Sequence, residues 1–136
     1  MTQRSRRKGK RGEYLVRDLL RSFGFESRRG IQSAGEPDQV HSIPGVHVEV
    51  KNDERLSIWA MLAQAERDAA LMGGEPVVFF KRNGTKLYVA TAAEEYLSAK
   101  RAQGIALEMH ELFTGGHDND TEIIRQFVEL MEGDPA

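Results

Sequence analysis

Residues 37–51 read PDQVHSIPGVHVEVK. Polar and apolar side chains alternate over residues 46–51, which predicts a β-strand with its valines on one face and its polar residues on the other. Residues 38–43 predict a second strand, and Pro44-Gly45 between the two strands is a turn signal. We therefore expect a β-hairpin in which Asp38 can reach the edge of the second strand.

Helices and strands alternate around this stretch. Apolar residues recur at helical spacing in two segments that each end at a glycine, and apolar runs bounded by turn signals predict further strands. In chain order we expect helix 9–23, strand 25–32, the hairpin, helix 57–72, strands 76–81 and 86–90, a helix from Thr91 toward Arg101 and a helix over 121–131, with 105–113 as either strand or helix. This order predicts the α/β class, with a central mixed β-sheet flanked by α-helices.

The composition is that of a globular protein with one core. The chain has 136 residues, of which 40% are hydrophobic and 29% charged, so it is long enough for one domain and too apolar for global disorder. No run approaches the roughly 18 apolar residues that cross a bilayer, so we expect no membrane contact. The lack of cysteine excludes disulfides, thiolate zinc sites and cysteine nucleophiles, and it fits a reducing cytoplasm. We expect this to be the cytoplasm of a bacterial, archaeal or phage-infected host cell.

The net charge of −2 hides a difference between the two ends of the chain. Residues 1–30 carry ten Lys and Arg against three Asp and Glu, a balance of +7, so the other 106 residues sum to −9. This asymmetry indicates a polyanionic partner for the basic end. We expect a basic flexible arm over 1–8, a core domain over 9–103, and an acidic C-terminal extension over 104–136 that packs on the core or across a dimer.

Three residues of the expected hairpin form a candidate metal site. Glu49 and Lys51 share a strand face, and Asp38 begins the neighbouring strand. Paired carboxylates suit Mg²⁺ or Mn²⁺, a metal there polarises a phosphate and activates water, and the lysine stabilises developing negative charge. The alternative is a solvated strand face, because a Glu-x-Lys triplet alone carries little information. The adjacent Pro37, the helical Glu13 and the basic N-terminus favour the catalytic interpretation.

The Pro37-Asp38…Glu49-Val50-Lys51 arrangement resembles the PD-(D/E)XK nuclease superfamily, which implies a restriction-endonuclease-like core. Over about residues 8–97 the pattern is similar to the archaeal-type Holliday junction resolvases of that superfamily. The features that carry this second likeness are a basic start, Glu13 in the first helix, Gly24 as its stop, Arg28 and Arg29 before Ser33, and the long helix over 57–72. The acidic segment beyond residue 97 lies outside the resemblance.

The resemblance implies a Mg²⁺-dependent endonuclease, with Mn²⁺ able to replace Mg²⁺, that acts as a homodimer on branched DNA such as four-way junctions. By position it makes Glu13, Asp38, Glu49 and Lys51 catalytic, with the metal held by Asp38, Glu49 and the carbonyl of Val50. It makes Arg28, Arg29 and Ser33 DNA contacts, and to these we add the basic residues near the N-terminus, Arg6, Arg7, Lys8, Lys10 and Arg11.

Two other functions stay open on the sequence alone. One is a different nuclease with the same core, such as a restriction-like or repair endonuclease. The other is a non-catalytic protein that binds nucleic acid through its basic arm.

Two further side chains also have alternatives. Gln64 either faces the site or is exposed on its helix. His47 is either a base beside Glu49 or a half-exposed strand residue.

Overall fold

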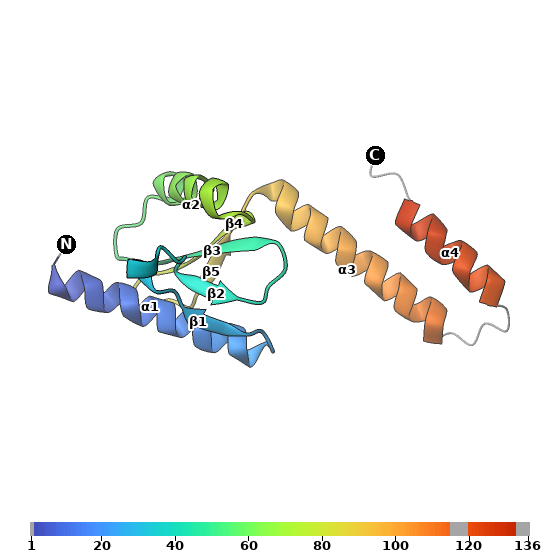
Figure 1. Cartoon of the computed structure of the whole chain (residues 1–136), viewed down its shortest axis with the longest axis horizontal. Coiled ribbons are helices and arrows are strands. Elements are labelled where there is room, and N and C mark those ends of the chain that lie inside the picture. The colour runs from blue at the N-terminus through green and yellow to red at the C-terminus, as the bar shows by residue number, and fades with distance from the viewer. Residues whose placement is uncertain (1, 115–119, 133–136) are drawn as a thin grey trace. The chain divides into compact units, whose positions relative to one another are not determined.

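The computed structural model describes residues 2–114 and 120–132. The chain forms two compact units, Met1–Ala92 and Ala93–Ala136, and their boundary lies before position 104, where we expected the acidic extension to begin. The first unit contains, in chain order, α1 (Gln3–Ser22), β1 (Ser27–Arg29), the 3₁₀ turn η1 (Gln32–Ala34), β2 (Gln39–His41), β3 (Val46–Asn52), α2 (Ile58–Met72), β4 (Glu75–Lys81) and β5 (Tyr88–Ala90) (Figure 1).

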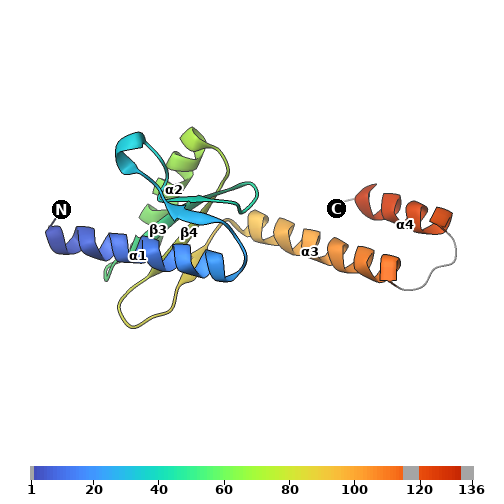
Figure 2. The same ribbon diagram turned by 60° about the horizontal axis from the view of Figure 1, so that its bottom comes forward.

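A mixed three-stranded sheet forms the centre of the first unit. β3 and β4 run parallel, with Glu49 opposite Val78, and β5 pairs antiparallel with β4. Helix α2 makes the crossover that a parallel pair requires. It lies on the opposite side of the strands from α1 (Figures 1 and 2). This arrangement confirms the predicted α/β class with a central mixed sheet flanked by helices.

β2 and β3 do not form the hairpin that the turn signal predicted. β2 pairs antiparallel with β1, with Ser27 opposite His41 and Arg29 opposite Gln39, in a separate two-stranded sheet. Gly45 does adopt a left-handed turn conformation, at φ 71°, but the chain then continues as an edge strand of the other sheet. A turn signal shows where the chain reverses, whereas the pairing of consecutive strands is only a tendency.

The predicted flexible arm is wrong, because α1 begins at Gln3 and includes the basic residues that precede Gly9. Thr2 caps the helix, and its side-chain oxygen accepts a hydrogen bond from the N–H of Ser5 at 3.2 Å. Lys and Arg have good intrinsic helix propensity, so a segment without apolar residues can still be helical when its end is capped. The cationic side chains are therefore carried by a helix and not by an unstructured tail.

The two faces of β3 have different surroundings. On the side of α1 lies an apolar core made of Val16, Leu20, Val48, Val50 and Phe79. On the side of α2, a smaller apolar cluster consists of Met61, Ala65 and Val78. The charged and ionisable residues of β3, His47, Glu49 and Lys51, lie on this second side. Because buried polar groups are costly unless they are paired or bound, this side is where a functional site is expected.

The second unit contains two helices that contact each other, α3 (Ala93–Thr114) and α4 (Asp120–Glu132). α3 continues through residues 105–113, so that ambiguous segment is helical and the helix does not end near Arg101. The helix predicted over 121–131 is confirmed. Residues 115–119 and 133–136 of the expected extension lie outside the described residues. Within the described ranges, no helix is long and apolar enough to span a membrane.

Candidate active site

Strand β3 carries Glu49 and Lys51 on the side covered by α2. Glu49 is buried, with 5% of its surface exposed, and the ammonium group of Lys51 donates to the side-chain oxygen of Gln64 on α2 at 2.8 Å. The interpretation of this face as solvated is therefore wrong, and Gln64 faces the candidate site. Asp68 lies one helical turn beyond Gln64, so it projects from the same side of α2.

Asp38 lies at the edge of β3, one residue before β2 begins. Its Oδ2 accepts a hydrogen bond from the backbone N–H of Val50 at 2.9 Å. Its Oδ1 accepts a long hydrogen bond from the side-chain amide of Gln32 in η1 at 3.4 Å. Ser33, the next residue of that turn, is exposed. Asp38 and Glu49 thus come together although β2 and β3 belong to different sheets.

The charged form of Glu49 is strongly disfavoured in the folded protein. Burial, and after it the carboxylates of Asp38 and Asp68, raise the pKa of Glu49 from 4.5 to about 9. Its Oε1 also lies 2.8 Å from Nε2 of His47, a residue that is 3% exposed and so is not the half-exposed strand histidine of the alternative interpretation. None of these neighbours is a lysine or an arginine. A cation bound among them would remove the electrostatic cost of the carboxylates.

Helix α1 brings Glu13 to the same group of acids. Burial raises the pKa of Glu13, a hydrogen bond from Arg29 lowers it by less, and the charge of Asp38 raises it again. The buried Gln39 holds this turn of α1, because its amide nitrogen donates to the main-chain carbonyl of Glu13 at 2.7 Å. The amide oxygen of Gln39 accepts from the hydroxyl of Ser27 at 2.7 Å. Glu13 is therefore positioned by both its side chain and its backbone.

Both arginines of β1 form ion pairs. Nε of Arg29 donates to Oε2 of Glu13, and its guanidinium lies 5.1 Å from the ring centre of Tyr14. Arg28 binds the two carboxylate oxygens of Glu36, each at 2.8 Å. This paired contact is the largest cause that lowers the pKa of Glu36 to about 2. Arg29 therefore supports the acidic group, whereas Arg28 lies on the exposed side of β1.

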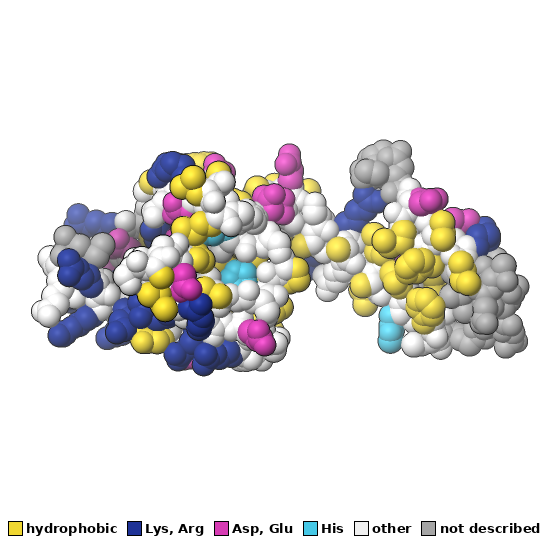
Figure 3. Space-filling view, viewed as in Figure 1, with side chains coloured by type: hydrophobic (Ala, Val, Ile, Leu, Met, Phe, Trp, Pro, Cys, Tyr) yellow, Lys and Arg dark blue, Asp and Glu magenta, His cyan; other side chains and the backbone are white. Residues whose placement is uncertain are grey.

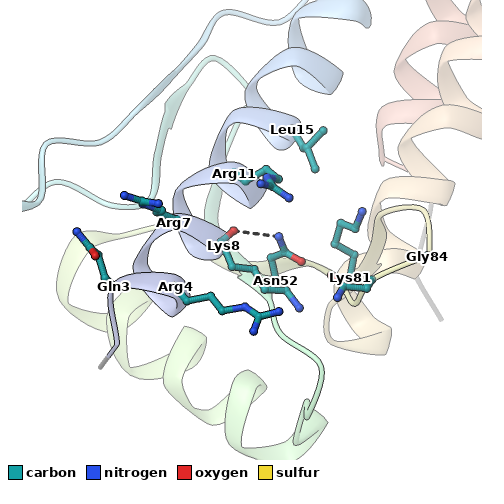
Figure 4. Close-up of a pocket in the computed structure, with 10 residues that line it drawn as sticks. Gln3, Arg4, Arg7, Lys8, Arg11, Leu15, Asn52, Lys81 and Gly84 are labelled. Carbon is teal, nitrogen blue, oxygen red and sulfur yellow. Dashed lines mark hydrogen bonds between the residues drawn. The ribbon is translucent and has the colours of Figure 1, made fainter.

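A pocket of about 630 Å³ lies beside the first half of α1 and is lined mainly by polar and cationic residues. Arg4, Arg7 and Arg11 are spaced by three and four residues, so they share one side of the helix. They line the pocket together with Lys81 at the end of β4 (Figure 4). Figure 3 shows Lys and Arg side chains gathered over α1. We call this group, Arg4, Arg7, Arg11 and Lys81, the cationic pocket.

The other basic residues near the N-terminus differ in their surroundings. Lys8 also lines the cationic pocket, and its ammonium group pairs with Glu54 at 2.6 Å. Lys10 lies 5.9 Å from the ring centre of Tyr14, outside the pocket lining, and Arg6 is exposed. Of the five expected there, the structure therefore brings together Arg7, Lys8 and Arg11.

Three residues of these sites were missing from the set expected from the sequence. Arg4 would have been found from its spacing to Arg7, had the helix been extended to residues before Gly9. Asp68 follows Gln64 by four residues, a spacing that places both on one helix side. Lys81 has no local signal, because it reaches α1 only through the arrangement of the sheet.

No protein-family model matches the chain, and no curated protein matches it. Among solved structures, the structure of this chain is similar to that of Hjc, a Holliday junction resolvase from the archaeal hyperthermophile Archaeoglobus fulgidus. The two chains share 23% sequence identity with a TM-score of 0.46, and the similarity covers 60% of this chain and 73% of the resolvase chain.

Proposed function

We propose that the chain is a metal-dependent endonuclease that hydrolyses phosphodiester bonds in DNA, with four-way junctions as its substrate and a homodimer as its active form. The observation that carries this proposal is the convergence of Asp38 and Glu49 beside Lys51, in a unit that also carries the cationic pocket. Acidic metal ligands, a lysine and a cationic surface serve the three needs of phosphodiester hydrolysis: a metal, charge stabilisation, and contact with the DNA backbone.

Asp38, Glu49 and the carbonyl of Val50 suit Mg²⁺, with Mn²⁺ able to replace it. All three offer oxygen, which is the donor that these ions prefer. In an extended strand the N–H and C=O of one residue face the same edge, so the Val50 carbonyl faces the side from which Asp38 accepts the Val50 N–H. A buried glutamate beside other carboxylates also favours a bound cation. When bound, the ion would polarise the scissile phosphate and lower the pKa of the attacking water.

Lys51 would stabilise the negative charge that develops on the phosphate in the transition state. The ammonium group of Lys51 donates to the side-chain oxygen of Gln64 at 2.8 Å. Because an ammonium group has three N–H donors, Lys51 can contact a phosphate while it keeps the hydrogen bond to Gln64. Glu13 would complete the acidic group. Its position is maintained by Arg29 and by the bond from Gln39 to its carbonyl oxygen.

The cationic pocket would bind the DNA backbone. Its residues come from α1 and from the end of β4, so a phosphate there would be contacted from two sides. We assign the exposed Arg28 and Ser33 to the same DNA surface. Such contacts are independent of base sequence and release counterions, so binding should weaken steeply as salt concentration rises.

A four-way junction requires two symmetric cuts, and each chain offers one acidic group of this kind among its described residues. A homodimer with twofold symmetry supplies two. Sedimentation velocity should therefore show a dimer at micromolar concentration. A chain that stays monomeric both free and bound to a junction would remove the four-way junction from its proposed substrates, while a nuclease that nicks one strand would still be possible.

The test is a cleavage panel that compares a four-way junction, a linear duplex and a single strand of matched sequence, each in Mg²⁺, Mn²⁺, Ca²⁺ and EDTA. We expect cleavage of the junction in Mg²⁺ and Mn²⁺, little in Ca²⁺, and none in EDTA. Equal cleavage of the duplex would indicate a restriction-like or repair nuclease. A junction that is bound but never cut in any metal would indicate a binding protein.

A further inference from the structure

A second group of potential metal ligands lies on the α2 side of β3. His47, Glu49 and Asp68 each offer one ligand atom, and these three atoms lie within 4.8 Å of one another. His47 and Glu49 are buried, and Asp68 is half-buried. Two packed elements, β3 and α2, therefore hold an imidazole and two carboxylates around one point.

The group shares only Glu49 with the ligands assigned to Mg²⁺. Asp38 reaches Glu49 from the edge of β3, whereas Asp68 reaches it from α2, and both interact with its carboxyl group. His47 contacts it from the same strand, with Nε2 2.8 Å from Oε1. A carboxylate has two oxygens, so Glu49 is able to contact two cations at once, as shared carboxylates do in two-metal sites.

We propose that His47, Glu49 and Asp68 form a second cation site that takes a first-row transition-metal dication, and that Glu49 bridges this ion to the one held by Asp38. The donor set explains the choice of ion, because an imidazole nitrogen suits transition metals, whereas Mg²⁺ prefers oxygen alone. Bonds of about 2.1 Å allow two ligands of one ion to lie up to about 4.2 Å apart. The ligand atoms of His47 and Glu49 are already 2.8 Å apart, so any movement that closes the group falls mainly on the half-buried Asp68.

The simpler interpretation is a hydrogen-bonded pair of His47 and Glu49 without a metal. In such a pair, the carboxyl groups of Asp38 and Asp68 would remain beside Glu49 without a cation. A metal site also needs a route of entry. A pocket of about 300 Å³ has His47, Pro37 and Met72 among its lining residues, so it reaches one of the three proposed ligands.

This inference rests on the proposed function, because Glu49 would serve both ions, so its test measures metal binding and not cleavage. The full chain, freed of metal with EDTA, is titrated with Mn²⁺, and bound ions are counted by electron paramagnetic resonance. Spin-echo modulation then reports whether a nitrogen nucleus is coordinated. We expect two Mn²⁺ per chain in the wild type, with nitrogen modulation from one of them.

The variants separate the two ions. Asp68→Asn and His47→Gln should each lose one equivalent of Mn²⁺ and the nitrogen modulation, whereas Asp38→Asn should lose the other ion and keep the modulation. His110→Gln is the matched control, because this histidine is exposed on α3, and it should bind two Mn²⁺.

A wild type without nitrogen modulation at saturating Mn²⁺ would overturn the inference, and this measurement needs no variant that might misfold. Modulation that persists in a folded His47→Gln protein would overturn it as well. If the wild type shows the modulated ion but cuts no DNA, the nuclease proposal fails and the second site stands. If it cuts DNA in Mg²⁺ but shows no modulation, the second site alone fails.

Discussion

Asp38 accepts the backbone N–H of Val50 at 2.9 Å, and this bond joins the residue before β2 to the edge of a strand in another sheet. The hydrogen bond attaches the side chain of Asp38 to the main chain of β3, the strand that carries Glu49. The position of the Asp38 carboxylate relative to Glu49 is therefore tied to the main chain of β3.

Asp38→Asn should abolish cleavage and preserve the fold. The amide keeps an oxygen that can accept the Val50 N–H, so the free energy of unfolding should change by less than about 1 kcal/mol. The negative charge is lost, so a metal ligand is weakened while DNA binding survives or tightens. Cleavage rates in Mg²⁺, gel shifts in Ca²⁺ and thermal unfolding check these points. A variant that cuts junctions at the wild-type rate would contradict the assigned role.

Glu49 should make the stability of the metal-free protein depend on pH. Its pKa is raised from 4.5 to about 9 in the folded state, so between these values the folded chain keeps a proton that the unfolded chain releases. The contribution of Glu49 to stability is therefore fully present below about pH 4.5 and is lost as pH rises toward 9. Glu49→Gln should flatten this dependence, and it should also lose much of the stabilisation by Mg²⁺ at pH 8. Urea unfolding at several pH values tests both effects, with Glu129→Gln on α4 as the exposed control.

Arg29 and Arg28 are adjacent but should differ in their effect on stability. Arg29→Ala removes the guanidinium partner of the Glu13 carboxylate, and the side chain of Glu13 is only 13% exposed. The free energy of unfolding should therefore fall by about 2 kcal/mol. Arg28→Ala breaks a pair with Glu36 that is open to solvent, so its effect on unfolding should be small. Equal losses of stability in the two variants would show that the pair of Arg29 and Glu13 has no special structural role.

The cationic pocket should set the salt dependence of DNA binding. Replacing Arg4 and Arg7 with alanine should weaken binding to all DNA sequences. Each lost phosphate contact should also make the salt dependence shallower, reducing the magnitude of the slope of log binding constant against log salt concentration by about 0.9. Point substitutions are preferable to deletion of residues 1–8, because those residues include the first turns of α1. Lys100→Ala on α3 is the matched control. An unchanged slope in the double variant would remove the pocket from the DNA surface.

Two glycines of α1 should respond in opposite directions to alanine. A Cβ at Gly12 would lie 2.7 Å from Cβ of Asn52 and 3.4 Å from Cγ1 of Val50, whereas a Cβ at Gly9 meets nothing within 4 Å. Gly12→Ala should therefore destabilise the protein by about 1–3 kcal/mol. Gly9→Ala should stabilise it by up to about 1 kcal/mol through helix propensity. Thermal unfolding of both variants gives the comparison, and stabilisation by Gly12→Ala would mean that α1 and β3 are not in close contact.

The alternation of β3 predicted that Glu49 and Lys51 share a face, and the structure agrees. It could not predict that this face is covered, because the periodicity of residues 57–72 defines the apolar side of a helix but not the strand on which it packs. The burial of His47 could not be predicted for the same reason. The alternation of the strand was compatible with a half-exposed histidine, and it is the packing of α2 that makes His47 a buried neighbour of Glu49.

The error in the predicted strand pairing has a physical cause, which is that long-range contacts decide between local alternatives. Pro44-Gly45 marks a real reversal, but β2 takes its hydrogen bonds from β1, a strand more than ten residues earlier. Lys81 could not be assigned for the same reason, since its neighbours on α1 are about seventy residues away in the chain.

The rigidity of α1 has a consequence for where DNA would be cut. Arg4 and Arg11 are about 10 Å apart along the helix axis, because each residue rises 1.5 Å, and this length is close to the rise of three nucleotides along the axis of a DNA duplex. Glu13, two residues beyond Arg11, lies with the acids that would hold the metal. If α1 binds DNA as proposed, the helix fixes the distance between the contacted phosphates and the cleaved bond. The number of nucleotides between them should therefore be constant across junctions of different sequence.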